Sequence, residues 1–202
     1  MSSFGGFLYA RSRTVPRTLA ALAGTVGFAV WAAERMDTYL DTDQRVPIVA
    51  LSPLLAAAVI GVSLHTPSDE LDRTAVRPWW PRRLTQLLAL TALAAALLPL
   101  AVLGDATAFG PPAMIRNTLG CVGVTAAASV VLGARLSWLP PFCFVGSVVL
   151  ASSGVRGPAV TVWAWPMQPG PQPGAWLAAG AAFVVGTAFY AVRGARPEGP
   201  RT

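Results

Sequence analysis

Residues 84–104 read LTQLLALTALAAALLPLAVLG and contain no charged side chain. A helix needs about 20 mostly apolar residues to cross the hydrocarbon core of a bilayer. This stretch has that length, so it predicts a membrane-spanning helix. Charge-free stretches recur on both sides of it, at residues 18–33, 46–68, 117–134, 136–155 and 157–192. The pattern predicts an integral membrane protein.

The composition supports this interpretation, because only 12% of the 202 residues are charged and 54% are apolar. A soluble domain usually carries about a quarter charged residues. We therefore expect an all-α membrane protein in which residues 1–202 form a single transmembrane domain. We expect six spans, at about 18–35, 46–65, 84–104, 115–133, 136–154 and 174–192. The first stretch also has features of a cleavable signal peptide, and cleavage would leave five spans.

The arginines predict the orientation of the spans, since cytoplasmic loops carry an excess of basic residues. All fifteen basic residues are Arg, and they lie between the spans instead of on one soluble face, so we expect no nucleic-acid partner. A cytoplasmic N-terminus places eleven arginines inside and four outside. We expect both termini in the cytoplasm of a bacterial cell and the chain in its plasma membrane. Tryptophans prefer the membrane interface, and Trp163, Trp165 and Trp176 are expected at the outer one.

The fifth span is expected to begin or kink at Pro140-Pro141, because a proline pair blocks a regular helix interior. The apolar segment 159–165 that follows either re-enters the outer leaflet or lies at the interface as a loop. The sixth span carries small residues four apart from Gly174 to Gly186. Such ladders let helices approach closely in lipid, here within the chain or, less favoured, in a dimer.

No catalytic, metal or cofactor motif is found in the sequence. The single histidine, His65, excludes an HExxH zinc site, and no phosphate-binding glycine loop is present. No acidic residue lies deep in an expected span, and ion-coupled carriers usually place one there. A transporter of this sequence would therefore need energy from a partner.

Arg116 and Asn117 form the most polar pair near the apolar body of a span. One interpretation is a polar contact for substrate at the outer end of a cavity, with Asp105 in the same outer loop to neutralise the charge. The other is an arginine at a span boundary that extends its guanidinium to the headgroups.

The polar segment HTPSDELDRTAVRPWWPRR, residues 65–83, separates the second and third expected spans. Thr66 and Pro67 are suited to the start of a helix, and acidic residues in its first turns favour the helix dipole. The Arg77-Pro78 pair ends it. We expect a short amphipathic helix over residues 66–76 at the inner surface, although a plain connecting loop fits as well.

Six spans with both ends inside and an acidic segment, SDELDRTAVRP, in the first inner loop resemble the permease subunits of actinobacterial ABC exporters. The apolar AVTVWAW segment before the last span also resembles the outer re-entrant region of that class. No diagnostic motif is matched residue by residue.

The resemblance implies a non-enzymatic subunit without a cofactor, working as a homo- or heterodimer with another permease chain in the lipid bilayer. The 66–76 helix would dock on a separate ATPase subunit through Asp69, Glu70, Asp72 and Arg73. The substrate would be amphipathic or lipid-like. A substrate-capture subunit of a vitamin importer and a non-transporting membrane accessory protein are the alternatives.

Overall fold

The computed structural model describes residues 15–39, 46–65, 80–102, 109–151 and 158–197, and within these ranges every regular element is helical. All six expected spans correspond to helices, with boundaries that differ by a few residues. The main helices are α2 (Val15–Tyr39), α3 (Val46–Ser63), α5 (Trp80–Leu97), α6 (Pro111–Leu132), α7 (Leu139–Ala151) and α9 (Pro173–Arg193). Shorter elements are α8 (Pro158–Trp163) and the 3₁₀ helices η2 (Leu98–Val102), η3 (Ala134–Leu136) and η4 (Trp165–Met167).

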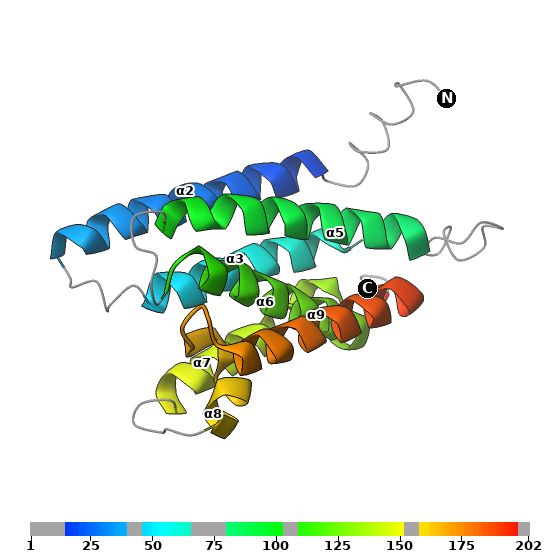
Figure 1. Ribbon diagram of the computed structural model, residues 1–202. Coiled ribbons are helices and arrows are strands. Elements are labelled where there is room, and N and C mark those ends of the chain that lie inside the picture. The colour runs from blue at the N-terminus through cyan, green and yellow to red at the C-terminus, as the bar shows by residue number, and fades with distance from the viewer. Residues whose placement is uncertain (1–14, 40–45, 66–79, 103–108, 152–157, 198–202) are drawn as a thin grey trace.

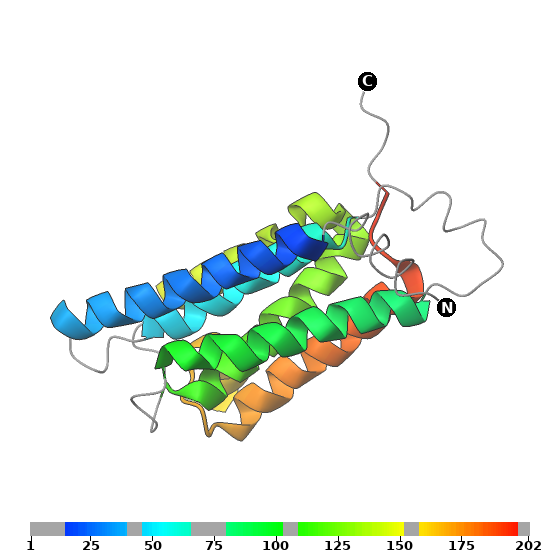
Figure 2. The same ribbon diagram turned by 90° about the horizontal axis from the view of Figure 1, so that it is seen from above.

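The main helices alternate in direction along the chain, as Figures 1 and 2 show. The start of α2 and the end of α9 consequently lie at the same end of the bundle. That end also receives the end of α3, the start of α5 and the end of α6, and we call it the basic end because of the arginines described below. The end of α2, the start of α3 and the end of α7 lie at the opposite end.

Helix α6 is the centre of the bundle, because it packs against α3, α5, α7 and α9. Its sequence suits this central position. The small residues Gly120, Gly123 and Ala126 allow neighbouring segments to approach the helix backbone closely. Met114 and Val122 are fully buried and fill the core. Two buried hydroxyls on α6 donate to carbonyls of the same helix: Thr118 Oγ1 to Met114 at 2.8 Å and Ser129 Oγ to Ala126 at 2.7 Å.

The closest crossing is that of α6 and α9, and it is made by two glycines. A Cβ added to Gly186 would meet the backbone of Gly123, with the carbonyl carbon at 2.7 Å. A Cβ added to Gly123 would meet the backbone of Ala182 and Phe183. The small residues of the last span therefore pack inside the chain. Small residues are needed there because they let the backbones of two membrane helices approach closely.

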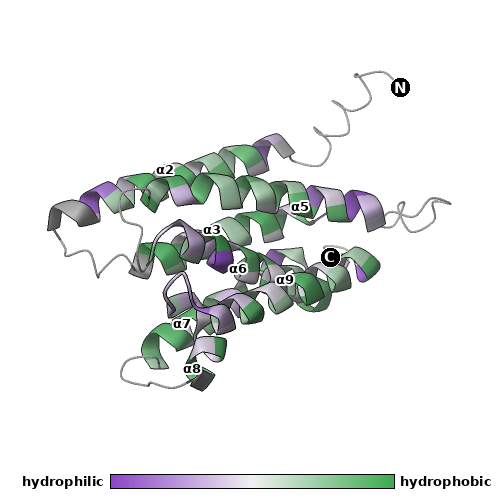
Figure 3. Cartoon of the chain, viewed as in Figure 1, coloured by the Kyte–Doolittle hydropathy of each residue, from purple (hydrophilic) through white to green (hydrophobic). Residues whose placement is uncertain are grey.

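Hydrophobic residues predominate along much of the helices (Figure 3), and many large ones are exposed on the bundle. Leu150, Leu177, Val185 and Val192 are between 66% and 83% exposed, which a soluble protein would avoid over so wide an area. Four segments are long and apolar enough to cross a membrane: Trp80–Val102, Pro111–Leu132, Ala134–Ala151 and Pro173–Arg193. The chain is thus a helical membrane protein.

The helices at the first two expected spans do not combine the length and the apolar composition of these four segments. Helix α2 is long but contains Arg17, Glu34 and Arg35, and the apolar part of α3, Ile48–Ser63, is short. Six crossings and the cytoplasmic location of both termini stay predictions. The expected 66–76 helix lies outside the described residues.

The segment after the fifth span differs from one expectation. Helix α7 begins at Leu139, so Pro140 and Pro141 occupy its first turn, as predicted. The following α8 and η4 fold back against α7 and α9. Trp165 was expected at the membrane interface, but it is only 4% exposed and lies in the core, because Gly120 leaves space for its indole.

Candidate functional site

The structure brings Arg116 and Asn117 together at the start of α6 and buries both side chains completely, at 0% exposure. Arg116 Nη1 donates to the Pro169 carbonyl at 2.8 Å, and Nη2 donates to the Gln168 carbonyl at 2.7 Å. Nε and Nη2 also donate to Asn117 Oδ1, at 3.2 and 3.1 Å. Four of the five N–H donors of the guanidinium are therefore used.

Asn117 completes a bridge between three parts of the chain. Its Nδ2 donates to the Val49 carbonyl at 3.0 Å and to the Pro166 carbonyl at 2.8 Å. Val49 lies in the first turn of α3, where Pro53 cannot donate the N–H that would otherwise take this carbonyl. We call Arg116, Asn117 and their four carbonyl partners the polar clamp. It joins α6, α3 and the 165–170 segment.

The clamp corrects the expectation of a guanidinium that extends to the headgroups. All of its partners are oxygens of amide groups, and in the part of the chain that the structure describes no carboxylate contacts Arg116. Asp105, the expected neutralising residue, lies outside the described residues. A buried charge must be well hydrogen-bonded to be tolerated, and this is the case here. Substrate contact by the pair stays a prediction.

The 165–170 segment is held from its apolar side as well. The indole of Trp165 lies over Gly120 of α6 and stacks on Phe144 of α7, with ring centroids 5.8 Å apart. Trp176 Nε1 donates to the Gly170 carbonyl at 2.8 Å. The clamp and this aromatic packing together hold the segment against α6.

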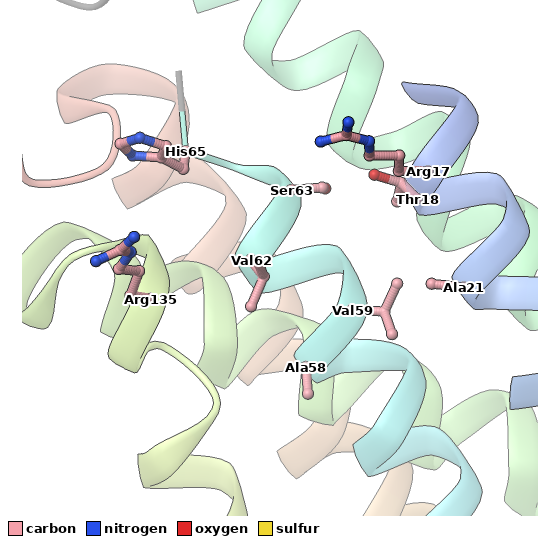
Figure 4. Close-up of a pocket in the computed structure, with 9 residues that line it drawn as sticks. All are labelled: Arg17, Thr18, Ala21, Ala58, Val59, Val62, Ser63, His65 and Arg135. Atoms are coloured by element: carbon pink, nitrogen blue, oxygen red, sulfur yellow. The ribbon is translucent and has the colours of Figure 1, made fainter. Parts of the chain in front are cut away.

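A second feature is a groove at the basic end of the bundle, drawn in Figure 4. Its volume is about 570 Å³, and α2, α3 and η3 line it. Ala21, Ala58, Val59 and Val62 form its apolar wall. The polar groups of the lining are Arg17, Thr18, Ser63, His65 and Arg135.

In the view of Figure 4, Arg17 extends from α2 toward Ser63, and His65 and Arg135 lie on the other side of the end of α3. Sequence reasoning missed this groove, because its basic residues come from three separate segments. The only signal was that each occurs at the border of an apolar stretch.

Most arginines of the described residues gather at this end. Arg82 and Arg83 lie in the first turn of α5, and Arg193 and Arg196 lie at or just beyond the end of α9. Arg83 packs over Gly194, whose φ of +73° a residue with a side chain rarely adopts. The asymmetry that predicted the membrane orientation is thus present in the folded bundle.

The remaining site expectations fall elsewhere. Asp69, Glu70, Asp72 and Arg73, the expected contacts for an ATPase, lie outside the described residues. Among the residues that are described, no group of three or more His, Cys, Asp or Glu side chains could hold a metal ion.

Comparison with known proteins gives no match to a protein-family model, a curated protein or a solved structure. The function must therefore be argued from the chain itself.

Proposed function

We propose that this chain is the membrane-spanning subunit of an ATP-driven exporter and that a separate ATPase subunit moves it. The observation that carries the proposal is the position of the 66–79 connection. It is flanked in the chain by His65, just after the end of α3, and by Trp80, the first residue of α5. A force on this connection acts directly on two helices that contact the central α6.

The charges in the bundle support an external source of energy. The described parts of the helices hold one fully buried charged side chain, Arg116, and it is fixed by carbonyl oxygens. Glu34 is exposed near the end of α2. Ion-coupled carriers place a titratable carboxylate or histidine near mid-membrane, and the described spans have none in that place.

A second chain of the same kind is expected to pack on α2. The small residues Ala20, Ala23, Gly24 and Gly27 are all exposed, and a Cβ added to either glycine would meet nothing within 4 Å. Small residues on an open helix face permit close approach of another membrane helix. This observation also favours the alternative of a vitamin-capture subunit, which docks on a membrane partner.

Co-purification with the ATPase encoded beside this chain tests the proposal. Glu70→Arg is expected to abolish recovery of the ATPase, because a charged contact that becomes repulsive costs several kcal/mol. Glu34→Arg makes the same change of charge at the other end of the bundle and should leave recovery unchanged. Failure of the wild-type chain to recover an ATPase, or equal recovery with Glu70→Arg combined with Asp72→Arg, would refute the proposal.

Orientation is tested separately by cysteine labelling in intact cells, with Cys143 replaced by Ser. Ser68→Cys is expected to resist a membrane-impermeant maleimide, and Asp41→Cys is expected to react. Labelling of Ser68→Cys from outside would overturn the topology.

A further inference from the structure

We infer that the groove between α2 and α3 binds one anionic phospholipid of the surrounding bilayer, with its phosphate at the basic rim and an acyl chain along the apolar wall. This inference stands independently of the proposed exporter function. It rests on the shape of the groove, the chemistry of its lining and its place at the basic end of the bundle.

The groove has two chemically distinct parts. The basic groups Arg17, His65 and Arg135 lie at the ends of elements, at the level where the described arginines gather. Ala21 lies one helical turn further along α2 than Arg17, about 6 Å deeper at 1.5 Å per residue. Ala58 lies five residues before Ser63, the last residue of α3, and is about 8 Å deeper by the same measure. A ligand that fills the groove therefore has a polar head at the rim and an apolar body below it.

The rim favours an anion. The carbonyl end of α3 lies here and carries about half a negative charge, which would by itself attract a cation. Arg17 and Arg135 each carry a positive charge, and no acidic residue is among the described residues that line the groove. Arginine is suited to phosphate because its planar fork donates two hydrogen bonds at once.

The size and setting favour a lipid over a soluble anion. A volume of about 570 Å³ is typical of sites for small molecules, and it exceeds the need of a free phosphate. The wall residues Ala21, Ala58, Val59 and Val62 would contribute nothing to binding of an inorganic anion. Basic pockets between membrane helices are suited to lipid headgroups for the same electrostatic reason.

Binding to the purified full-length chain in detergent, measured by native mass spectrometry, tests the inference. The probes are dioleoyl-phosphatidylglycerol, dioleoyl-phosphatidylcholine and glycerol phosphate. We expect the phosphatidylglycerol to bind at least ~10-fold more tightly than the phosphatidylcholine, and we expect no competition from glycerol phosphate.

The double variant Arg17→Gln, Arg135→Gln should weaken phosphatidylglycerol binding ~30-fold, because each basic group near an anionic lipid contributes roughly fivefold. The double variant Arg193→Gln, Arg196→Gln is the matched control, since both arginines lie at the same end, neither lines the groove, and the same number of charges is removed. Ala58→Trp keeps every charge but fills the groove, and it should reduce binding of the lipid to a similar degree.

Three results would overturn the inference: equal affinity for the two lipids, wild-type phosphatidylglycerol binding by the Arg17→Gln, Arg135→Gln chain, or displacement of lipid by glycerol phosphate at equal concentration. The last result would identify a soluble phosphate ligand instead. Thermal unfolding of each variant confirms that it is folded. Should the double variant be unfolded, Ala58→Trp decides the question, because retained lipid affinity there excludes the groove.

Discussion

Replacement of Arg116 by Met tests the structural role of the polar clamp. Methionine has a comparable length and no donor, so three acceptors lose their hydrogen bonds: the carbonyls of Gln168 and Pro169, and Asn117 Oδ1. An acceptor that is left buried without a donor costs about 1–3 kcal/mol. The two backbone carbonyls are only partly buried, so we assign them about 1 kcal/mol each, and about 2 kcal/mol to the fully buried Asn117.

These contributions add up to about 4 kcal/mol, and one term opposes them. Methionine does not suffer the desolvation penalty of a buried guanidinium, which amounts to several kcal/mol and is partly recovered in the variant. We expect a net loss of about 3 kcal/mol in the free energy of unfolding. At about 2–4 °C for each kcal/mol in a chain of this size, the melting temperature should fall by about 6–12 °C.

Thermal unfolding in detergent measures this loss, with Arg193→Met as the control. Arg193 is exposed and its guanidinium carbon lies 5.2 Å from the centroid of the Phe189 ring, so its replacement should cost less than about 1 kcal/mol. A second readout is the labelling rate of Gln168→Cys in a chain without other cysteines, which should rise when Arg116 is replaced. A melting temperature of Arg116→Met within about 2 °C of that of the control would refute the reasoning. Such a difference corresponds to only about 0.5 kcal/mol in the free energy of unfolding.

Three further predictions follow from the contacts around α6. Asn117→Leu should cost about 2–4 kcal/mol, because two buried carbonyls lose their donor, and its effect should not add to that of Arg116→Met in a double-mutant cycle of unfolding free energies. Full additivity would show that the two side chains act separately. Gly186→Val should lower the melting temperature strongly, since the added side chain meets backbone, whereas Gly180→Ala on the same helix, with open space around its Cβ, should be neutral or stabilising by about 0.5–1 kcal/mol. Equal effects of the two substitutions would argue against the close crossing of α6 and α9. Gly120→Val should displace the indole that lies over it and shift tryptophan emission to longer wavelength, and an unchanged spectrum would contradict this packing.

The clamp shows a limit of sequence reasoning at a particular pair of residues. Arg116-Asn117 stood out because it is polar beside an apolar run, but the guanidinium was expected to reach the headgroups. Arg116 donates to the carbonyls of Gln168 and Pro169, and Asn117 donates to those of Val49 and Pro166, all of which are far away in the chain. Local polarity predicted that the pair matters, and it could not indicate which oxygens would surround it.

The sequence alone determined the class of protein and the approximate positions of the helices. Charge-free stretches of about 20 residues have few other solutions, because each backbone polar group in lipid must be satisfied within the same segment. The uneven distribution of arginine could also be read without a structure, and it reappears as the basic end of the bundle.

Only the tertiary structure decided which side chains face inward and which segments meet. Gly123 and Gly186 are separated by 63 residues, and their contact depends on the packing of α6 on α9. In the sequence, Trp165 resembles an interfacial tryptophan. In the structure its indole is buried in the core, because Gly120 has no side chain and leaves room for it. The groove likewise exists only because the start of α2, the end of α3 and η3 lie at one level. These features arise from the fit between helix surfaces, which local composition does not specify.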